Sequence, residues 1–437
     1  MIDRLYKTYI QSRTVTTDSR AITPGCIFFA FKGEHFDGNA FAPKALEQGA
    51  ALCVISDAQY AVDDRCIVVD DVLATLQALA REHRRHLTIP IIGITGTNGK
   101  TTTKELVHAV LAKRYKTSAT KGNFNNHLGV PLTLLGIPEH TELAIVEMGA
   151  NHPGEIEFLC GIADPDCGLI TNVGRAHLEG FGSFEGVVRT KTELYRHLAG
   201  KQGLVFVNAD NERLMQEAVG MKTYTYGRHE GVDVRGTLVS EPASARAESP
   251  YLHFYFEVGD NVYNVRTHLL GDYNFDNCMA AVAVGLRFGV EPWDIKEAIE
   301  EYEPSNNRSE FKRTGRNDLY LDCYNANPSS MAAAIASFSN LASQVPHSMA
   351  IIGGMHELGA EEREEHRRVV AQLAQSGVGQ VLLVGAEWDG LEVPANMRRF
   401  ADTESLRGWL AAHPVSDATI LVKGSNTNRL WTLEELL

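Results

Sequence analysis

The sequence predicts an α/β fold that is divided into three domains. The chain has 437 residues, whereas one domain usually has ~100–200 residues. Short apolar runs alternate with helix-length segments along most of the chain, which is typical of parallel sheets with crossover helices. These runs fall into three blocks, and a hydrophobic content of 44% is sufficient to give each block a buried core.

The first block, residues 1–89, predicts a small α/β domain. Its strand-like runs are CIFFAF, ALCVIS and CIVVD, and its helix-like runs are NAFAPKALEQGA and DVLATLQALAREHRRHL. Apolar runs of four to eight residues between helical segments are consistent with buried strands.

The second block, residues 90–313, predicts a central domain with a parallel sheet. It begins with the apolar run IPIIGIT, a glycine-containing loop and the amphipathic segment KELVHAVLAKRY. Further buried-strand runs follow in ELAIVEMGA, CGLITNVG and GLVFVNAD, each separated by a helix-length segment. Residues 232–270 instead alternate polar and apolar side chains, which predicts an antiparallel insertion.

The third block, residues 314–437, predicts a doubly wound, Rossmann-like domain. Its strand-like runs are LYLDCY, SMAIIGGM, QVLLVGAE and ATILVKGS, with helical segments between them. The chain shows no internal repeat and no low-complexity segment.

Composition narrows the class of protein. The formal net charge is 41 − 55 = −14, whereas proteins that coat nucleic acid are usually basic. Seven scattered cysteines without a CxxC pair indicate reduced thiols rather than a disulfide framework. The N-terminus MIDRLYKTYIQSR lacks the apolar core of a signal peptide, and no apolar run approaches the roughly 18 residues of a membrane span. We therefore expect a cytoplasmic protein without membrane insertion.

The stretch GITGTNGKTTTKE, residues 93–105, predicts a phosphate-binding loop. Glycines let the backbone curl around a phosphate, and a helix N-terminus favours anions. Lys100 would add a charge on the outer phosphates, and Thr101 would place a hydroxyl on a magnesium ion. The strict P-loop pattern has glycine at the position of Ile94, so this loop is a variant. An ordinary βα turn is the alternative, but the flanking strand and helix favour a nucleoside triphosphate with magnesium.

Polar residues follow the predicted strands of the second and third blocks. Ligands of open parallel sheets bind at the carboxyl ends of strands, so these residues indicate a cleft between two domains. They are Glu147, Arg175, His177, Glu179, Asp322, Asn325, Asn327, His356, Glu357 and Asn426.

Several candidate residues, including Lys191 and Arg308 elsewhere in the second block, also have an alternative interpretation. Glu147 suits a magnesium ligand, but it could equally cap a helix or form a salt bridge. A lone histidine such as His177 is more often packed or exposed than a ligand, and Lys191 alone is most simply a solvated lysine. Arg308 could contact a phosphate or ribose, or lie in a linker. The run HELGAEEREEH lacks HExxH spacing, so we interpret it as a solvated helix.

Taken together, these motifs resemble the Mur ligase family over nearly the whole chain. The motifs occur in the family's order: TGTNGKTTTKE, KGNFNNHLGVPLTLL, IVEMGANHPGEIEFL, LITNVGRAHLEGFGSFEGVVRTKTEL, VFVNADN and DCYNANPSSMAAAI. The N-terminal stretch TDSR…TPGCIFFAFKGEHFDGNAF resembles the family's UDP-sugar domain. Within the family, NFNNHLGVPLTLL, EMGANHPGEI and NANPSSM are most similar to the members that add a D-alanyl-D-alanine dipeptide.

The resemblance implies a role for each candidate residue. For ATP these are Gly96, Thr97, Asn98, Gly99, Lys100, Thr101, Thr102, Asn274, Arg308 and Asp322. Thr101, Glu147 and His177 would ligate magnesium, with two ions expected. Lys191 matches a lysine that family members carry as a carbamate. Lys100, Lys191, His177 and Glu147 form the implied catalytic set.

The substrate-binding residues implied are Ser19, Arg20, Asn123, Asn126, Asn325 and Asn327, with Ser19 and Arg20 at the uridine diphosphate group. Tyr273 stands where relatives often have histidine, which weakens the assignment of Asn274 to adenine.

The implied activity is ATP-dependent ligation of D-alanyl-D-alanine to UDP-N-acetylmuramoyl-tripeptide through an acyl phosphate. This reaction makes a pentapeptide precursor of peptidoglycan, and we expect a monomer that acts on small molecules and not on nucleic acid. Three alternatives remain open: a folylpolyglutamate synthase-like ligase, a sister ligase that adds a single amino acid, and an ATP-binding switch that makes no bond. The presence of Glu147, His177 and Lys191 argues against the switch.

Overall fold

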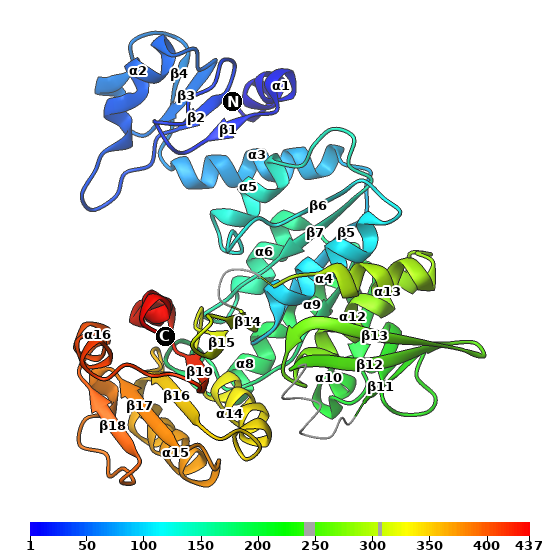
Figure 1. The fold of residues 1–437 in the computed structure, drawn as a ribbon. Helices are drawn as coiled ribbons and strands as arrows, with labels where there is room; N and C mark the ends of the chain where they lie inside the picture. The colour runs from blue at the N-terminus through cyan, green and yellow to red at the C-terminus, as the bar shows by residue number, and fades with distance from the viewer. Residues whose placement is uncertain (240–249, 305–307) are drawn as a thin grey trace.

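The computed structural model describes residues 1–239, 250–304 and 308–437. Across these residues the strands form three sheets that follow one another along the chain, which confirms the predicted three-domain α/β fold. Figure 1 shows the N-terminal domain at the top, the central domain below it and the C-terminal domain beside the central one. In the described part of the chain, each helix is too short or too polar to span a bilayer.

The N-terminal sheet is parallel, with the strand order β1-β2-β3-β4. Its strands are β1 (Val15–Thr16), β2 (Ile27–Phe29), β3 (Leu52–Ile55) and β4 (Cys66–Val68). Its helices are α1 (Ile2–Ser12), η1 (Gly38–Phe41), α2 (Ala42–Glu47), η2 (Ala58–Tyr60) and α3 (Val72–His86). Helix α3 begins after Asp71, whose side chain accepts a hydrogen bond from the Ala74 amide and so caps the helix.

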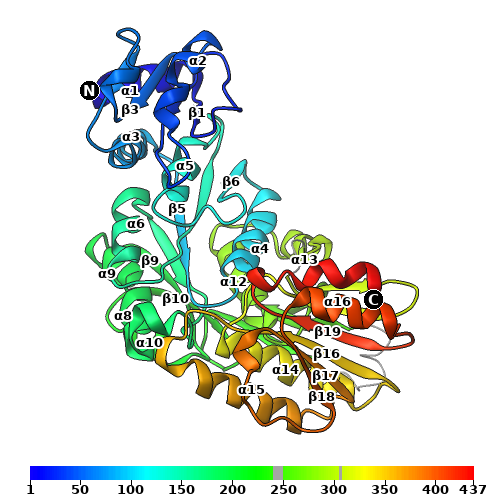
Figure 2. The same cartoon turned by 90° about the vertical axis from the view of Figure 1, so that its left-hand side faces the viewer.

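Helix α3 connects the N-terminal domain to the central domain (Figures 1 and 2). Its buried residues Leu76 and Leu79 belong to one hydrophobic core that also contains Tyr9 of α1 and Leu134 of the central domain. The Tyr9 hydroxyl donates to the Leu135 carbonyl at 2.8 Å, across the same boundary. The two domains are therefore packed together and are not merely joined by a linker.

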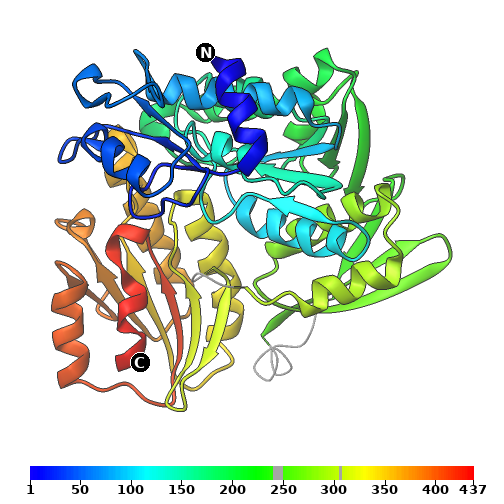
Figure 3. The same ribbon diagram turned by 90° about the horizontal axis from the view of Figure 1, so that it is seen from above.

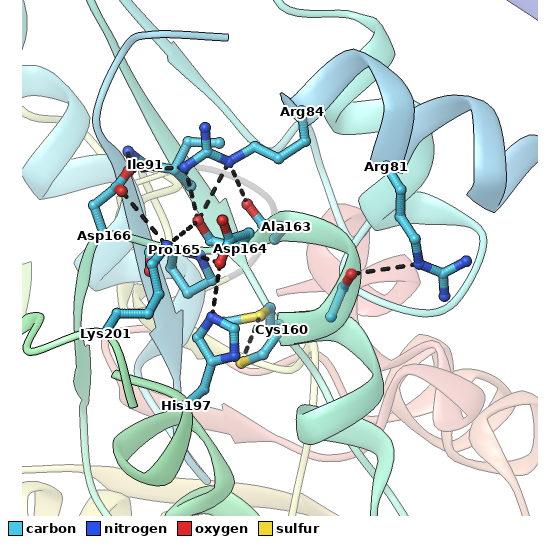
Figure 4. Close-up of polar contacts among 12 residues, drawn as sticks. Arg81, Arg84, Ile91, Cys160, Ala163, Asp164, Pro165, Asp166, His197 and Lys201 are labelled. Carbon is cyan, nitrogen blue, oxygen red and sulfur yellow. Dashed lines mark hydrogen bonds and ion pairs between the residues drawn. The ribbon is translucent and has the colours of Figure 1, made fainter. Parts of the chain in front are cut away.

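Arg84, a buried residue near the end of α3, contacts the central domain through a polar network (Figure 4). Its guanidinium donates to the carbonyls of Leu87, Ala163 and Asp164 at 3.1, 2.9 and 2.8 Å, and to Asp166 Oδ2 at 2.9 Å. Lys201 Nζ and His197 Nε2 contact Asp164 Oδ1 from the opposite side at 2.7 and 3.1 Å.

The central sheet has the strand order β13-β12-β11-β10-β9-β8-β5-β7-β6. Its strands are β5 (Ile91–Thr95), β6 (Thr117–Ala119), β7 (Leu143–Glu147), β8 (Cys167–Ile170), β9 (Leu204–Asn208), β10 (Lys222–Gly227), β11 (Val234–Leu238), β12 (Tyr251–Val258) and β13 (Asn261–Leu270). Its helices are α4 (Lys100–Ala112), α5 (Gly129–Leu135), α6 (Glu155–Ala163), α7 (Leu178–Phe181), α8 (Phe184–Lys191), α9 (Glu193–Gly200), α10 (Glu212–Glu217), α12 (Asn274–Arg287) and α13 (Pro292–Glu301).

The predicted antiparallel segment is an extension of the central sheet. Strand β11 pairs in parallel with β10 and antiparallel with β12, and β12 pairs antiparallel with β13. Residues 240–249 of this segment lie outside the described residues. The hydrophobic core beneath the three strands is shared with α4 and α12, because Phe254, Val107 and Val282 belong to one cluster.

The C-terminal sheet has the strand order β14-β15-β19-β16-β17-β18, antiparallel at β14–β15 and parallel elsewhere. Its strands are β14 (Glu310–Arg313), β15 (Asp318–Asp322), β16 (Ser348–Gly353), β17 (Gln380–Val384), β18 (Met397–Phe400) and β19 (Thr419–Lys423). Its helices are α14 (Pro328–Ala342), η3 (Gly359–Glu361), α15 (Glu362–Gln375), η4 (Ala386–Trp388), α16 (Thr403–Ala412), η5 (Asn426–Asn428) and η6 (Leu430–Leu436). Seen from above, this domain lies alongside the central domain (Figure 3).

Candidate active site

A cavity of about 640 Å³ lies between the central and C-terminal domains. The central domain lines it with loops that follow β5, β7 and β8, and the C-terminal domain lines it with residues that follow β15 and β19. Both sheets therefore contribute the carboxyl ends of their strands, where open parallel sheets bind ligands. The sequence-predicted residues on its wall are Thr97, Asn98, Gly99, Lys100, Thr101, Thr102, Asn123, Asn126, Glu147, His177, Asn274, Arg308, Asp322 and Asn325.

The loop between β5 and α4 has the geometry of a phosphate-binding loop. Gly99 precedes α4 in the left-handed region, with φ +76°, and a Cβ added there would overlap the Asn277 amide. The Lys100 ammonium lies over the loop and donates to the carbonyls of Gly96 and Thr97 at 2.8 and 3.0 Å. Burial lowers the pKa of Lys100, and the nearby Glu147 carboxylate opposes this shift. The loop therefore presents a helix N-terminus and a partly buried cation to the same cavity.

Glu147, at the end of β7, accepts hydrogen bonds through only one of its two carboxylate oxygens. Asn125 Nδ2 and Thr101 Oγ1 donate to Oε1 at 2.8 and 3.3 Å. The other oxygen, Oε2, is buried and has no hydrogen-bond partner among the described residues. Buried polar atoms are rarely left unpaired, so this oxygen is suited to a ligand in the cavity.

The Glu147 site is chemically suited to magnesium. Mg²⁺ prefers oxygen ligands, and it usually binds one or two carboxylates together with phosphate oxygens and water. Within the described ranges, no group of three or more His, Cys, Asp or Glu side chains is placed to hold a metal ion. A single carboxylate with one unpaired oxygen beside a phosphate loop fits a magnesium site in which phosphate and water supply most of the ligands.

His177 also lines the cavity; it directly precedes α7 and has a backbone φ of 49°. Its Nδ1 pairs with Glu357 Oε2 of the C-terminal domain. Burial lowers the pKa of His177, and the hydrogen bond to Glu357 opposes this shift.

Lys191, at the end of α8, is only 2% exposed and does not line the cavity directly. Its Nζ donates to the carbonyl of Ala150, a residue on the cavity wall, at 3.2 Å and lies 5.3 Å from the centre of the Phe181 ring. Burial, reinforced by the charge of Lys100, lowers the pKa of Lys191 well below the usual value for lysine. Burial and the charge of Lys100 thus disfavour the ammonium form at this position.

The C-terminal domain contributes a second polar group of residues. The Arg308 guanidinium lies over the Tyr324 ring at 3.6 Å. Lys423 Nζ pairs with Asp322 Oδ2 at 2.9 Å and donates to the Asn325 carbonyl at 3.0 Å. A cation–π contact and a buried ion pair hold this wall in a defined arrangement.

Asn274 adjoins this group from the start of α12. Its Nδ2 donates to the Leu270 carbonyl at 2.7 Å and to Ser309 Oγ at 3.1 Å. Tyr273, the position that departs from the family pattern, also lines the cavity, and its hydroxyl lies 3.2 Å from Ser309 Oγ.

Some predicted residues do not line the cavity. Gly96 is the first residue of the loop, and its carbonyl accepts a hydrogen bond from Lys100. Asn327 Nδ2 donates to Asn98 Oδ1 at 2.7 Å, so it joins the two domains. Ser19 and Arg20 belong to the N-terminal domain, where the Arg20 guanidinium pairs with Asp18 at 2.8 Å.

The sequence analysis missed several wall residues, among them Asn125, Asn172, Asn277, Tyr324 and Lys423. Asn125 lies inside the NFNNHLGVP motif, and Asn277 lies one helical turn after Asn274, so their spacing offered a signal. Lys423 ends an apolar strand and could have been identified by the same argument that identified Glu147.

The expectation that HELGAEEREEH forms a solvated helix is wrong in part. Helix α15 begins only at Glu362, and Glu365 and His366 are buried. Three acidic residues of this run contact the central domain: Glu357 pairs with His177, and Glu361 and Glu365 pair with Arg175. These pairs form because docking brings together segments that are far apart in sequence.

The variant phosphate loop and the cleft define a nucleotide-binding α/β protein whose C-terminal domain borders the phosphate site. Three family models match the chain: the Mur ligase middle domain over residues 94–285, the Mur ligase glutamate ligase domain over 307–426 and the Mur ligase family catalytic domain over 12–84. The chain belongs to the Mur ligase family, as the sequence motifs predict, and is an ADP-forming ligase.

Curated relatives of this chain include the UDP-N-acetylmuramoyl-tripeptide–D-alanyl-D-alanine ligases of Bacillus subtilis and Escherichia coli. The B. subtilis protein is 36% identical over 85% of this chain and 79% of its own length. The E. coli protein is 32% identical over 94% of this chain and 91% of its own length.

Among solved structures, MurF of Acinetobacter baumannii is similar, with a TM-score of 0.84, 30% identity and coverage of 97% of this chain and 92% of its own. MurF of Thermotoga maritima in complex with ADP has a TM-score of 0.83 and 27% identity, covering 97% of both chains.

Proposed function

We propose that this chain joins D-alanyl-D-alanine to UDP-N-acetylmuramoyl-tripeptide with the conversion of ATP to ADP and phosphate. The observation that carries the proposal is the cavity in which a phosphate loop, a half-paired carboxylate and the C-terminal domain meet. Relatives with this activity in their names match nearly the full length of the chain. We assign residues 1–89 to the UDP-sugar, residues 90–313 to ATP and residues 314–437 to completing the ligase site.

The ATP site would run from the phosphate loop to the C-terminal wall. The backbone of residues 96–102 and the Lys100 ammonium would hold the phosphates. Asn274, Arg308 and Asp322 would contact adenine, phosphate and ribose, and all three line the same cavity as Lys100.

Thr101, Glu147 and His177 would hold magnesium, with two ions expected. When bound, magnesium would neutralise charge on the phosphate oxygens. The unpartnered Oε2 of Glu147 supports this assignment.

Lys191 would act as a carbamate. A buried ammonium close to Lys100 is unfavourable, and a neutral amine is the form that reacts with carbon dioxide. Burial lowers the pKa of Lys191 well below the usual lysine value, which supports this chemistry. The resulting carbamate would place an anion beside the cations of the site.

The reaction would proceed in two steps. An oxygen of the peptide carboxylate attacks the γ-phosphorus of ATP, the bond to ADP breaks, and an acyl phosphate forms. The amine of D-alanyl-D-alanine then attacks the acyl carbon, loses a proton, and phosphate leaves with the former carboxylate oxygen. Because phosphoryl transfer depends on positioning and on charge neutralisation, Lys100 and the loop amides would supply the chain's contribution to the first step.

Residues of all three domains would contact the substrates. Ser19 and Arg20 would contact the uridine diphosphate in the N-terminal domain. Asn123 and Asn126 line the cavity on the central side, where the stem peptide would lie. Asn325 and Asn327 would contact the dipeptide, with Asn327 acting from the domain junction. The enzyme is expected to act as a monomer in the cytoplasm.

Isotope transfer tests this mechanism. The tripeptide substrate is labelled with ¹⁸O in its terminal carboxylate, and the phosphate released in the presence of D-alanyl-D-alanine is analysed by mass spectrometry. One ¹⁸O atom in each phosphate is expected, because the carboxylate oxygen bonds to phosphorus. Unlabelled phosphate together with formation of the pentapeptide would contradict the acyl phosphate route.

A further inference from the structure

The start of helix α7 and the loop after strand β16 contact each other across the domain boundary in an unusual way. His177 and Glu357 face each other, and their backbone φ angles are 49° and 61°. Residues other than glycine seldom adopt positive φ angles. Their side chains are paired, and the Glu179 amide donates to the Glu357 carbonyl at 3.2 Å. A Cβ added at Gly359 would lie 3.3 Å from that of Glu179, so the two segments are closely packed.

This contact determines which nitrogen of His177 is available in the cavity. Nδ1 is occupied by Glu357, whereas Nε2 makes no hydrogen bond among the described residues. Histidines that ligate metals usually donate their other ring N–H to a carboxylate or carbonyl, which fixes the ring and its tautomer. Here that carboxylate comes from a different domain.

We propose that Glu357 is a positioning residue that orients His177 for magnesium, so that docking of the C-terminal domain completes the metal site of the central domain. The inference rests on the proposed function, because it assumes the metal-ligating role of His177. Glu357 itself does not line the cavity. It acts only through the His177 ring.

The other contacts between these domains do not substitute for Glu357. Arg175 pairs with Glu361 and Glu365, and its amide donates to Ser329 Oγ at 2.8 Å. These groups hold the domains together but make no hydrogen bond or ion pair with His177 among the described residues.

The Glu357 side chain is 51% exposed, and half-exposed ion pairs contribute little to stability. A variant at Glu357 is therefore expected to fold. Glu361 is a matched control, because it is an acidic residue four positions away whose side chain is 44% exposed and crosses the same boundary.

The test uses Mn²⁺ as a spectroscopic probe in the full-length protein with ADP. Electron spin-echo envelope modulation detects a directly bound imidazole nitrogen as a ¹⁴N signal. Wild type and Glu361→Ala are expected to show this signal, Glu357→Ala to lose it or reduce it several-fold, and His177→Ala to lack it. Loss of carboxylates that orient metal-binding histidines typically lowers metal affinity or activity about 10–100-fold, so kcat of Glu357→Ala is expected to fall by that factor, with Glu357→Gln intermediate.

Each other outcome has a distinct meaning. A full ¹⁴N signal in Glu357→Ala would overturn the inference while leaving His177 as a ligand. Equal loss in Glu357→Ala and Glu361→Ala would overturn it in favour of general domain docking. No ¹⁴N signal in a wild-type protein that ligates the dipeptide would remove His177 from the metal site, and the inference with it, without affecting the proposed reaction. Absence of ligation would instead contradict the proposed function.

Discussion

Replacing Arg84 by methionine should lower the stability of the interface between the N-terminal and central domains. The Arg84 side chain is 10% exposed and donates to four acceptors, three of which are main-chain carbonyls. Figure 4 shows its contacts with Ala163, Asp164 and Asp166. Methionine keeps much of the aliphatic stem but provides no donor. One acceptor, Asp166 Oδ2, also receives the Ile91 amide at 2.8 Å, so the network holds the first residue of β5.

The expected loss follows from the number of acceptors left unpaired. A buried group that loses its partner costs about 1–3 kcal/mol. Water can reach some of the four acceptors, and the Asp166 side chain is 43% exposed, so their effects will not add fully and we expect about 3–5 kcal/mol in total. Because about 1.4 kcal/mol corresponds to a tenfold change, local opening should become roughly a hundred to a few thousand times more frequent.

Hydrogen–deuterium exchange of the Ile91 amide measures this opening. Arg85→Met is the matched control, since the neighbouring Arg85 side chain is 72% exposed and pairs only with Glu82 of its own helix among the described residues. A pair of this kind contributes less than about 1 kcal/mol. Equal exchange rates at Ile91 in the two variants would show that the Arg84 hydrogen bonds do not stabilise the start of β5.

Three further predictions concern single residues. Lys191→Ala should abolish ligation and small carboxylic acids should partly restore it, because they replace the carbamate; full activity without added acid would remove Lys191 from the site. Gly99→Ala should raise the KM for ATP about tenfold or more, because a Cβ in the left-handed region costs about 1–2 kcal/mol and would overlap Asn277; an unchanged KM in steady-state assays would contradict this. His83→Phe should remove part of the acid sensitivity of stability. Burial lowers the pKa of His83 from 6.5 to about 4, so the unfolded chain takes up this proton first, and stability falls as the pH drops below 6.5 towards 4, by at most about 3 kcal/mol. Identical stability profiles of the variant and wild type across this range, measured by urea unfolding, would exclude His83 as the cause.

The strands and the phosphate loop could be predicted because their signals are local. The runs that become β5, β7 and β8 are apolar throughout, as buried parallel strands require. Gly99 precedes a helix and takes a left-handed conformation, which its place in the glycine-containing loop indicates. Glu147 could be selected because it is the polar last residue of an otherwise apolar strand, next to the strand that leads into the phosphate loop.

Contacts between domains could not be predicted in the same way. The motif predicts that Asn327 binds substrate, but it gives no sign that the Asn327 amide pairs with Asn98, a residue 229 positions away. Glu357 was assigned to a solvated helix, and only docking shows that it contacts His177. Local pattern identifies which face of an element is apolar, but it does not identify the partner that covers a polar side chain.

The most direct test of the account is phosphate release by the purified protein with ATP, magnesium and UDP-N-acetylmuramoyl-tripeptide. The assay is run with D-alanyl-D-alanine, with single amino acids, with a folate and glutamate in place of both substrates, and without an acceptor. Phosphate release is expected to require D-alanyl-D-alanine, and Lys100→Ala is expected to abolish it. Release that a single amino acid or the folate pair supports equally well, or no release in any mixture despite ATP binding, would contradict it.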